Sequence, residues 1–138
     1  MSAPFVLLLS LLFAGVGYHR AYDTKVLEVD VPLAADCAPF AHLRVVQLSD
    51  LHVTSLTPKA WLEEVVAKTN ALEPDMICIT GDIADLDLPD LQGYMAPLRQ
   101  LRARYGVYYV DGNHEYYKGQ IFLWRRFVKD LGFVELHN

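Results

Sequence analysis

The sequence predicts an α/β fold in which short strands alternate with helices around a mostly parallel sheet. From residue 43 onward, short apolar runs alternate with segments whose apolar residues recur at helical spacing. Turn and capping residues separate these segments. The 138 residues are 53% hydrophobic and 21% charged, so the chain can bury one core, and disordered and fibrous classes are excluded.

The charge and the cysteine content exclude further classes. A net charge of −5 argues against a protein that binds nucleic acid through a broad basic surface, so we expect no nucleic-acid partner. The two cysteines, Cys37 and Cys78, are too few for a disulfide scaffold or a thiolate zinc site.

Residues 1–18 form an apolar run without a side chain that is charged at neutral pH. As a helix they would span roughly 27 Å, slightly less than a hydrocarbon core of about 30 Å. A membrane anchor, a cleaved signal peptide and a buried core helix are the three interpretations. We favour the anchor, because a signal peptide normally has a basic residue before its apolar run and none is present.

The first basic residues, Arg20 and Lys25, follow the apolar run. By the positive-inside rule they would keep the following domain in the cytoplasm, but two residues are a weak bias, so the side of the membrane stays open. We divide the chain into a membrane anchor or signal segment at 1–18, a connector at 19–24 and a domain at 25–138.

The domain begins with two predicted strands. Residues 25–33 alternate between apolar and acidic side chains, which predicts a half-buried strand closed by Pro32. A loop at 34–42 follows. Residues 43–48 are more continuously apolar, which predicts a strand covered on both faces.

Helices and strands alternate after this point. Thr57 as N-cap and Pro58 at the first helical position predict a helix that ends before Pro74. The next elements are a strand at 76–80, a helix at 89–104 with Leu91, Met95, Leu98 and Leu101 inward, a strand at 106–110, a helix at 119–131 with Gly132 as C-cap, and a strand at 133–136.

Polar clusters follow three of these strands. They are Ser49-Asp50-Leu51-His52, Gly81-Asp82-Ile83-Ala84-Asp85 and Asp111-Gly112-Asn113-His114-Glu115. Each cluster alone is an ordinary turn or loop, but together they recur at intervals of one strand and one helix. Because the carboxyl ends of parallel strands meet at one edge of a sheet, we expect the three clusters to lie side by side.

The residue types in these clusters suit divalent metals. Carboxylate, imidazole and amide groups are ligands for Mn, Fe, Zn or Mg. Asp50 and His52 are two positions apart and can chelate one ion from a strand end. Asp82 can bridge two ions with its two oxygens, and the neutral Asn113 would leave a second ion its Lewis acidity.

The motifs Asp-x-His, Gly-Asp and Gly-Asn-His-Glu, in this order, resemble the signature of the calcineurin-like metallophosphoesterase superfamily. Three segments resemble the bacterial membrane-associated branch of this superfamily: RVVQLSDLH, DMICITGDIAD and YYVDGNHEYY. The resemblance covers residues 43–138. It implies a metallophosphoesterase-type β-sandwich flanked by helices, in four layers (αββα), of which this chain would form the N-terminal half after its apolar helix.

The resemblance also implies a set of roles. Asp50 and His52 would bind the first of two divalent metal ions, Asp82 would bridge both, and Asn113 would bind the second. His114 would act as a catalytic acid that protonates the leaving alkoxide, and Asp85 would orient it. The two ions would clamp the phosphoryl oxygens and lower the pKa of a shared attacking water.

The sequence departs from this signature after Glu115. The family completes its site with later histidines, including a Gly-His-x-His motif, whereas His137 is the only later histidine here and stands in a different context. We therefore expect the chain alone to be inactive and the complete enzyme to hydrolyse phosphate ester or diphosphate bonds of a phosphorylated small molecule or lipid at a membrane. The alternative is a non-catalytic, membrane-tethered remnant that serves as a binding module.

Overall fold

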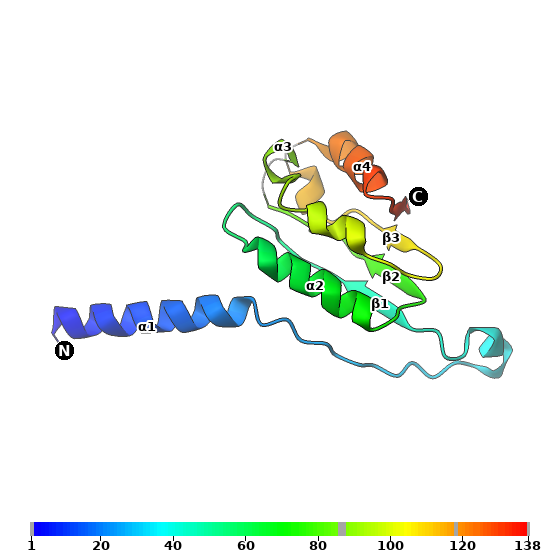
Figure 1. Ribbon diagram of the computed structural model, residues 1–138, viewed down its shortest axis with the longest axis horizontal. Helices are drawn as coiled ribbons and strands as arrows, with labels where there is room; N and C mark the ends of the chain where they lie inside the picture. Colours follow the sequence, from blue (N-terminus) through cyan, green and yellow to red (C-terminus); the bar gives the residue numbers. More distant parts are fainter. Residues whose placement is uncertain (1, 86–87, 118, 138) are drawn as a thin grey trace. The chain divides into compact units, whose positions relative to one another are not determined.

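The structure is a computed structural model that describes residues 2–85, 88–117 and 119–137. The chain divides into two compact units, Met1–Pro32 and Leu33–Asn138. Both are drawn in Figure 1, and each is described here by itself.

The first unit consists of helix α1, Ala3–Ala21, followed by extended chain. The helix is long and apolar enough to cross a membrane. None of its side chains is buried within this unit. The predicted strand at 25–33 is wrong, because a strand needs a neighbour for its backbone hydrogen bonds and no described strand pairs with this segment.

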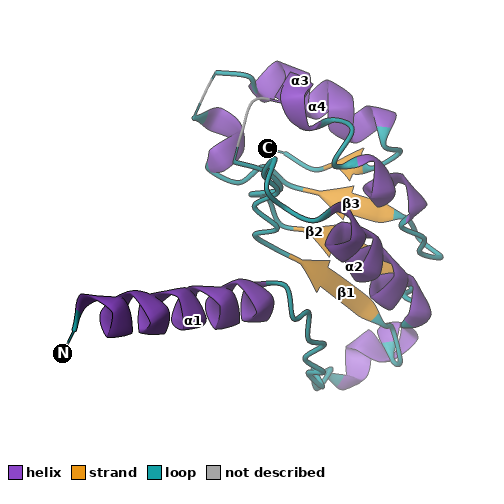
Figure 2. Ribbon diagram, turned by 60° about the vertical axis from the view of Figure 1, so that its left-hand side comes forward, coloured by secondary structure: helices purple, strands orange, loops and turns teal. Residues whose placement is uncertain are grey.

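The second unit contains one parallel sheet. Its strands are β1 (Val45–Leu48), β2 (Met76–Ile79), β3 (Val107–Tyr109) and β4 (Val134–Glu135). They pair in the order β1-β2-β3-β4, all parallel, as Figure 2 shows. Because parallel strands in sequential order are joined by right-handed crossovers, the connecting helices lie on one face of the sheet.

The helical layer is less regular than the sequence predicts. Its elements are α2 (Lys59–Ala71), α3 (Leu88–Leu91), η2 (Ala96–Gln100), η3 (His114–Tyr116) and α4 (Ile121–Asp130). The short helix η1 (Ala35–Phe40) precedes β1 and is not part of this layer. The single helix predicted at 89–104 is wrong. Pro97 cannot donate a backbone hydrogen bond in the middle of that span, and two short helices, α3 and η2, replace it.

The start of α2 also differs from the prediction. Thr57 does not cap the helix, which begins at Lys59 with Pro58 in the N-cap position. The Thr57 hydroxyl instead accepts a hydrogen bond from the backbone N–H of Thr54, at 2.9 Å. This bond closes a turn in the loop that connects β1 with α2.

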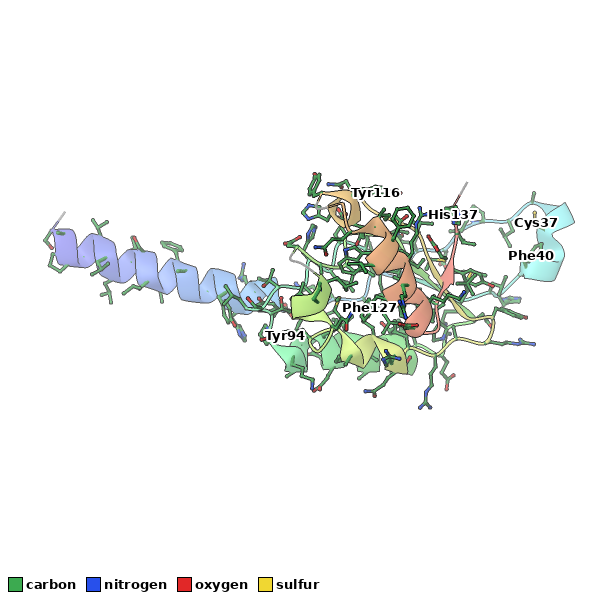
Figure 3. All side chains as sticks on the ribbon, turned by 90° about the horizontal axis from the view of Figure 1, so that it is seen from above. Cys37, Phe40, Tyr94, Tyr116, Phe127 and His137 are labelled. Atoms are coloured by element: carbon green, nitrogen blue, oxygen red, sulfur yellow. The ribbon has the colours of Figure 1, made fainter. Side chains whose placement is uncertain are left out.

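The hydrophobic core lies between the sheet and the helical layer. Ile77, Ile79, Val107 and Tyr109 point into it, and they meet side chains such as Leu62 of α2, Met95 and Leu98, and Phe127 of α4. The four inward positions predicted for 89–104 are all buried despite the broken helix. Figure 3 places Phe127 in this core and Cys37, a free thiol, on η1.

The opposite face of the sheet is open among the described residues. Val45 and Gln47 of β1 and Val134 of β4 are exposed, and Cys78 and Tyr108 are half-buried. Within this chain β1 is therefore covered on one face only, whereas its apolar sequence predicts cover on both faces. The structure confirms the predicted α/β class: an apolar N-terminal helix, then a parallel sheet with helices, consistent with part of a metallophosphoesterase fold.

Candidate metal centre

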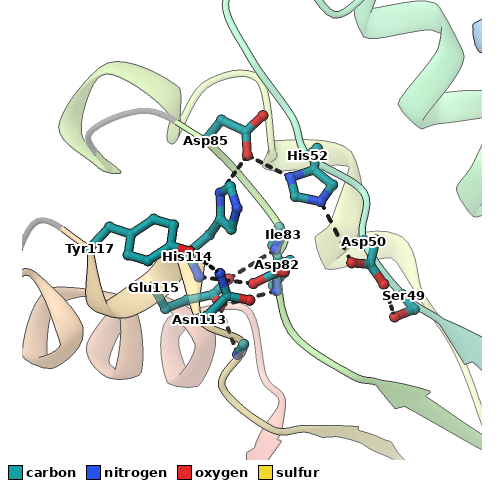
Figure 4. A network of polar contacts seen from close by, with 11 residues as sticks. Ser49, Asp50, His52, Asp82, Ile83, Asp85, Asn113, His114, Glu115 and Tyr117 are labelled. Carbon is teal, nitrogen blue, oxygen red and sulfur yellow. Dashed lines mark hydrogen bonds and ion pairs between the residues drawn. The ribbon is translucent and has the colours of Figure 1, made fainter.

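The three polar clusters meet at the carboxyl edge of the sheet, beyond β1, β2 and β3, as Figure 4 shows. Backbone hydrogen bonds join the first two loops: His52 N–H donates to the Asp82 carbonyl at 3.0 Å, and Val53 N–H to the Ile83 carbonyl at 2.8 Å. The two loops thus continue the parallel pairing of β1 and β2 by a short bridge. The sequence-based expectation that the clusters lie side by side is met.

Three residues predicted as metal ligands have left-handed backbones. The φ angles are 54° at Asp50, 43° at His52 and 51° at Asp82. Residues other than glycine rarely adopt this region, and holding one there costs on the order of 1 kcal/mol. Such strain persists only where the surroundings enforce it, and it is concentrated here in the predicted ligands.

Asp85 holds two imidazoles at once. Its Oδ1 forms a hydrogen bond with Nδ1 of His52 at 2.5 Å and lies 2.8 Å from Nδ1 of His114, at ion-pair distance. The two rings meet edge to face, with centroids 4.7 Å apart. Because both Nδ1 atoms face this carboxylate, the Nε2 atoms are the ones that could bind a metal or exchange a proton.

The contact with Asp85 also favours the protonated form of His52. The hydrogen bond to Asp85 raises the pKa of His52, against the opposing effect of burial, and the charges of Asp85, Asp82 and Asp50 raise it further. A metal ion would compete with this proton for the imidazole.

The donor atoms fit a divalent metal ion. Ligand atoms of His52, Asp82 and His114 all lie within 4.8 Å of one another. Oδ1 of Asp50 lies 3.6 Å from Nε2 of His52, and its other oxygen bonds the Ser49 hydroxyl. Two imidazoles and carboxylates at this spacing suit Mn, Fe or Zn. The cluster includes His114, which the resemblance assigns to acid catalysis.

Asp82 is packed against the third loop. Its Oδ1 accepts a hydrogen bond from the backbone N–H of His114 at 2.9 Å. The approach depends on glycine: a Cβ on Gly112 would lie 2.2 Å from that Oδ1, and a Cβ on Gly81 would lie 2.2 Å from the Gly112 nitrogen. No larger residue fits at either position without a shift of the backbone or of Asp82.

Two residues that sequence reasoning left without a role belong to the site. Glu115 is buried, and its carboxylate accepts the N–H groups of Asp82 at 3.1 Å, Ile83 at 2.9 Å and Gly112 at 2.8 Å. Tyr117 lies with its ring centroid 4.8 Å from that of His114, and its hydroxyl oxygen accepts a hydrogen bond from Nδ2 of Asn113 at 2.5 Å. The sequence signal is their place within three residues after Asn113-His114.

An ion-pair cluster behind the site secures the third loop. Nη2 of Arg125, on α4, lies 3.1 Å from Oδ2 of Asp111, and its Nε lies 2.8 Å from Oε1 of Glu135. His137 lies near Glu135, at 3.7 Å, and is exposed. It takes no part in the candidate centre.

Comparisons with known proteins identify the family. The family model for calcineurin-like phosphoesterases matches residues 43–138. A transmembrane protein with metallophosphoesterase domain from Danio rerio is 32% identical over 87% of this chain and 28% of its own length. Its namesake from Bos taurus is 37% identical over 87% of this chain and 27% of its own length.

A third relative is the UDP-2,3-diacylglucosamine pyrophosphatase LpxG of Chlamydia trachomatis, which is 40% identical over 56% of this chain and 25% of its own length. The chain thus spans about a quarter of the length of these relatives. The match of the family model over the three motif-bearing loops, together with the convergence of those loops on one group of candidate metal ligands, shows that the chain belongs to the calcineurin-like phosphoesterase family.

Proposed function

We propose that this chain supplies the first metal position and the proton donor of a phosphoesterase that hydrolyses phosphate ester or diphosphate bonds. The observation that carries the proposal is the convergence of His52, Asp82 and His114 within 4.8 Å in a chain of this family. Each comes from a different strand end, so the cluster exists only in the folded sheet.

We assign Asp50, His52 and Asp82 to one divalent ion, and Asp82 with Asn113 to a second. The Asn113 amide supports this assignment, because its Nδ2 donates to Tyr117 and its carbonyl oxygen is left to bind. Bound divalent ions of the Mn, Fe, Zn or Mg type supply positive charge toward phosphoryl oxygens and acidify an attacking water.

His114 is assigned as the catalytic acid, with Asp85 orienting it. Asp85 holds Nδ1 of His114, so Nε2 carries the proton to be delivered when the imidazole is charged. Proton donation by a positioned histidine contributes about 10²- to 10⁴-fold to a rate.

We propose a phosphorylated lipid, or a small phosphorylated molecule, as the substrate at a membrane surface. LpxG is named for a diacylated sugar nucleotide, and the vertebrate relatives are named transmembrane proteins. Large apolar side chains are exposed on segments that adjoin the site: Leu56 is 80% exposed, Tyr117 69% and Phe122 79%. Residues 1–18 would anchor the protein, so their removal should shift it from the detergent phase to the aqueous phase.

The number of metal ligands also limits the metal binding and the activity that we expect of this chain alone. The second ion would receive only Asp82 and Asn113 from the described residues, and two protein ligands hold a divalent ion weakly. We therefore expect residues 19–138 alone to bind at most one metal per chain and to show no hydrolysis above background. This weak second position is the observation that favours the alternative, a non-catalytic binding module.

The test is Asp82→Asn in the complete protein, assayed with manganese and a chromogenic aryl phosphate diester. Elemental analysis should show that both metal positions are empty, and turnover should disappear. Asp30→Asn, an exposed carboxylate in the first unit, is the control and should keep both. Normal metal content in Asp82→Asn would overturn the assignment.

A further inference from the structure

The loops that follow β2 and β3 are joined by hydrogen bonds in both directions, in which a carboxylate of each loop accepts backbone N–H groups of the other. Glu115, in the loop after β3, accepts the N–H groups of Asp82 and Ile83 in the loop after β2. In return Asp82 accepts the N–H of His114 at 2.9 Å. Figure 4 shows these bonds side by side. We name this pair of cross-loop contacts the Asp82–Glu115 clasp.

We propose that Glu115 is a positioning residue that sets metal affinity by fixing the backbone of Asp82. The inference rests on the proposed metal site, in which Asp82 is the shared ligand. Glu115 itself is only 1% exposed and contacts backbone, so it does not act as a ligand.

The positions of the hydrogen bonds that Glu115 accepts support a role in orienting Asp82. The Asp82 N–H belongs to the peptide unit before its Cα, and the Ile83 N–H to the unit after it. Glu115 therefore holds both peptide units that flank Asp82. Fixing both units fixes φ and ψ of Asp82, and with them the direction of its side chain.

The backbone conformation of Asp82 needs the support of these hydrogen bonds. Asp82 has a φ of 51°, a region that side chains other than glycine rarely adopt. Hydrogen bonds to a carboxylate are roughly twice as strong as neutral ones, and Glu115 makes three of them, the third with Gly112 N–H at 2.8 Å. All three partners are donors, so an acceptor-only carboxylate is the group that fits this position.

The experiment compares Glu115→Gln with wild type in the complete protein. Glutamine keeps the shape, but its amide NH₂ must face at least one backbone N–H, so at least one of the two peptide units that flank Asp82 is released. We expect the Kd for Mn²⁺, measured by isothermal titration calorimetry, to rise about 10- to 100-fold, the usual range for residues that orient metal ligands.

The control separates positioning from loss of stability. Val128→Ala, in the core on α4 and away from the three loops, should lower the melting temperature and leave the Kd for Mn²⁺ unchanged. A wild-type Kd in Glu115→Gln, whatever its melting temperature, would overturn the inference.

Two further outcomes are informative. If Glu115→Gln fails to fold, Glu115→Asp, which keeps the charge with a shorter reach, takes its place and should also show a raised Kd; a wild-type Kd there would overturn the inference. If the wild-type protein binds no Mn²⁺ or other divalent ion, the proposed function fails first, and that result is distinct from an unchanged Kd in the variant.

Discussion

Gly112→Ala tests how closely the second and third loops must approach. An added Cβ would lie 2.2 Å from Oδ1 of Asp82, 2.5 Å from its backbone nitrogen and 2.8 Å from its Cγ. Ordinary contact begins at 3.4 Å, so the carboxylate has to retreat by about 1.2 Å. The backbone nitrogen cannot easily follow, because Glu115 holds its N–H.

The expected effect follows from this displacement. Ligands in metal sites have to be held within about 0.5 Å of the productive geometry, and a misplacement of about 1 Å costs on the order of 10²-fold in activity. We therefore expect Gly112→Ala to lower turnover about 100-fold or more, equal to about 2.7 kcal/mol of transition-state stabilisation. Overpacking should also lower stability by about 1–3 kcal/mol.

The assay combines Mn²⁺ titration, elemental analysis and hydrolysis of an aryl phosphate by the complete protein. Gly93→Ala is the matched control, because a Cβ there meets nothing within 4 Å. It should leave metal binding and turnover unchanged. Wild-type metal affinity in Gly112→Ala would refute the reasoning, since it would show that Asp82 can bind a metal from a displaced position.

Four further predictions concern the side chains around the candidate metal centre. Asp85→Asn should raise the Kd for Mn²⁺ about 10- to 100-fold, and an unchanged Kd would show that His52 needs no such partner. Because Asp85 raises the pKa of His52, the pair stabilises the metal-free protein fully below about pH 6.5 and loses this effect as pH rises through the folded pKa. In EDTA, the melting temperature of wild type should thus exceed that of Asp85→Asn most at low pH, and a constant difference between about pH 5 and 8 would contradict this. Tyr117→Phe should release the Asn113 amide and weaken the second metal position alone, as read from the loss of spin coupling between two Mn²⁺ ions. His114→Ala should keep both metals yet lose most activity on esters with poor leaving groups; lost metal would identify it as a ligand instead.

The arrangement of the site could be predicted from the sequence because it depends on the order and direction of the strands. Each motif directly follows an apolar strand, and parallel strands end at one edge, so Asp50, Asp82 and Asn113 had to come together. The buried positions within residues 89–104 were also predicted correctly, because burial depends on the spacing of apolar side chains. The prediction of one regular helix over this span failed, because Pro97 interrupts the backbone hydrogen bonds.

Other features depend on partners far along the chain. Residues 25–33 have the alternation of a strand, but alternation supplies no neighbour, and the segment is extended without pairing among the described residues. Glu115 bonds to N–H groups that are 32 and 33 positions earlier. A sequence pattern shows that a charged residue follows the motif, but not which backbone it reaches.

The left-handed backbone at Asp50 has an evolutionary consequence. Its side chain is largely exposed, and glycine is relaxed at a φ of 54°. Mutation of this predicted ligand to glycine would remove a carboxylate from the candidate metal centre and relieve the backbone rather than break the fold. The fold itself therefore does not require an acidic residue at this position. Once selection for catalysis ends, descendants of such an enzyme can lose the reaction and still persist as folded proteins, open to recruitment for other tasks.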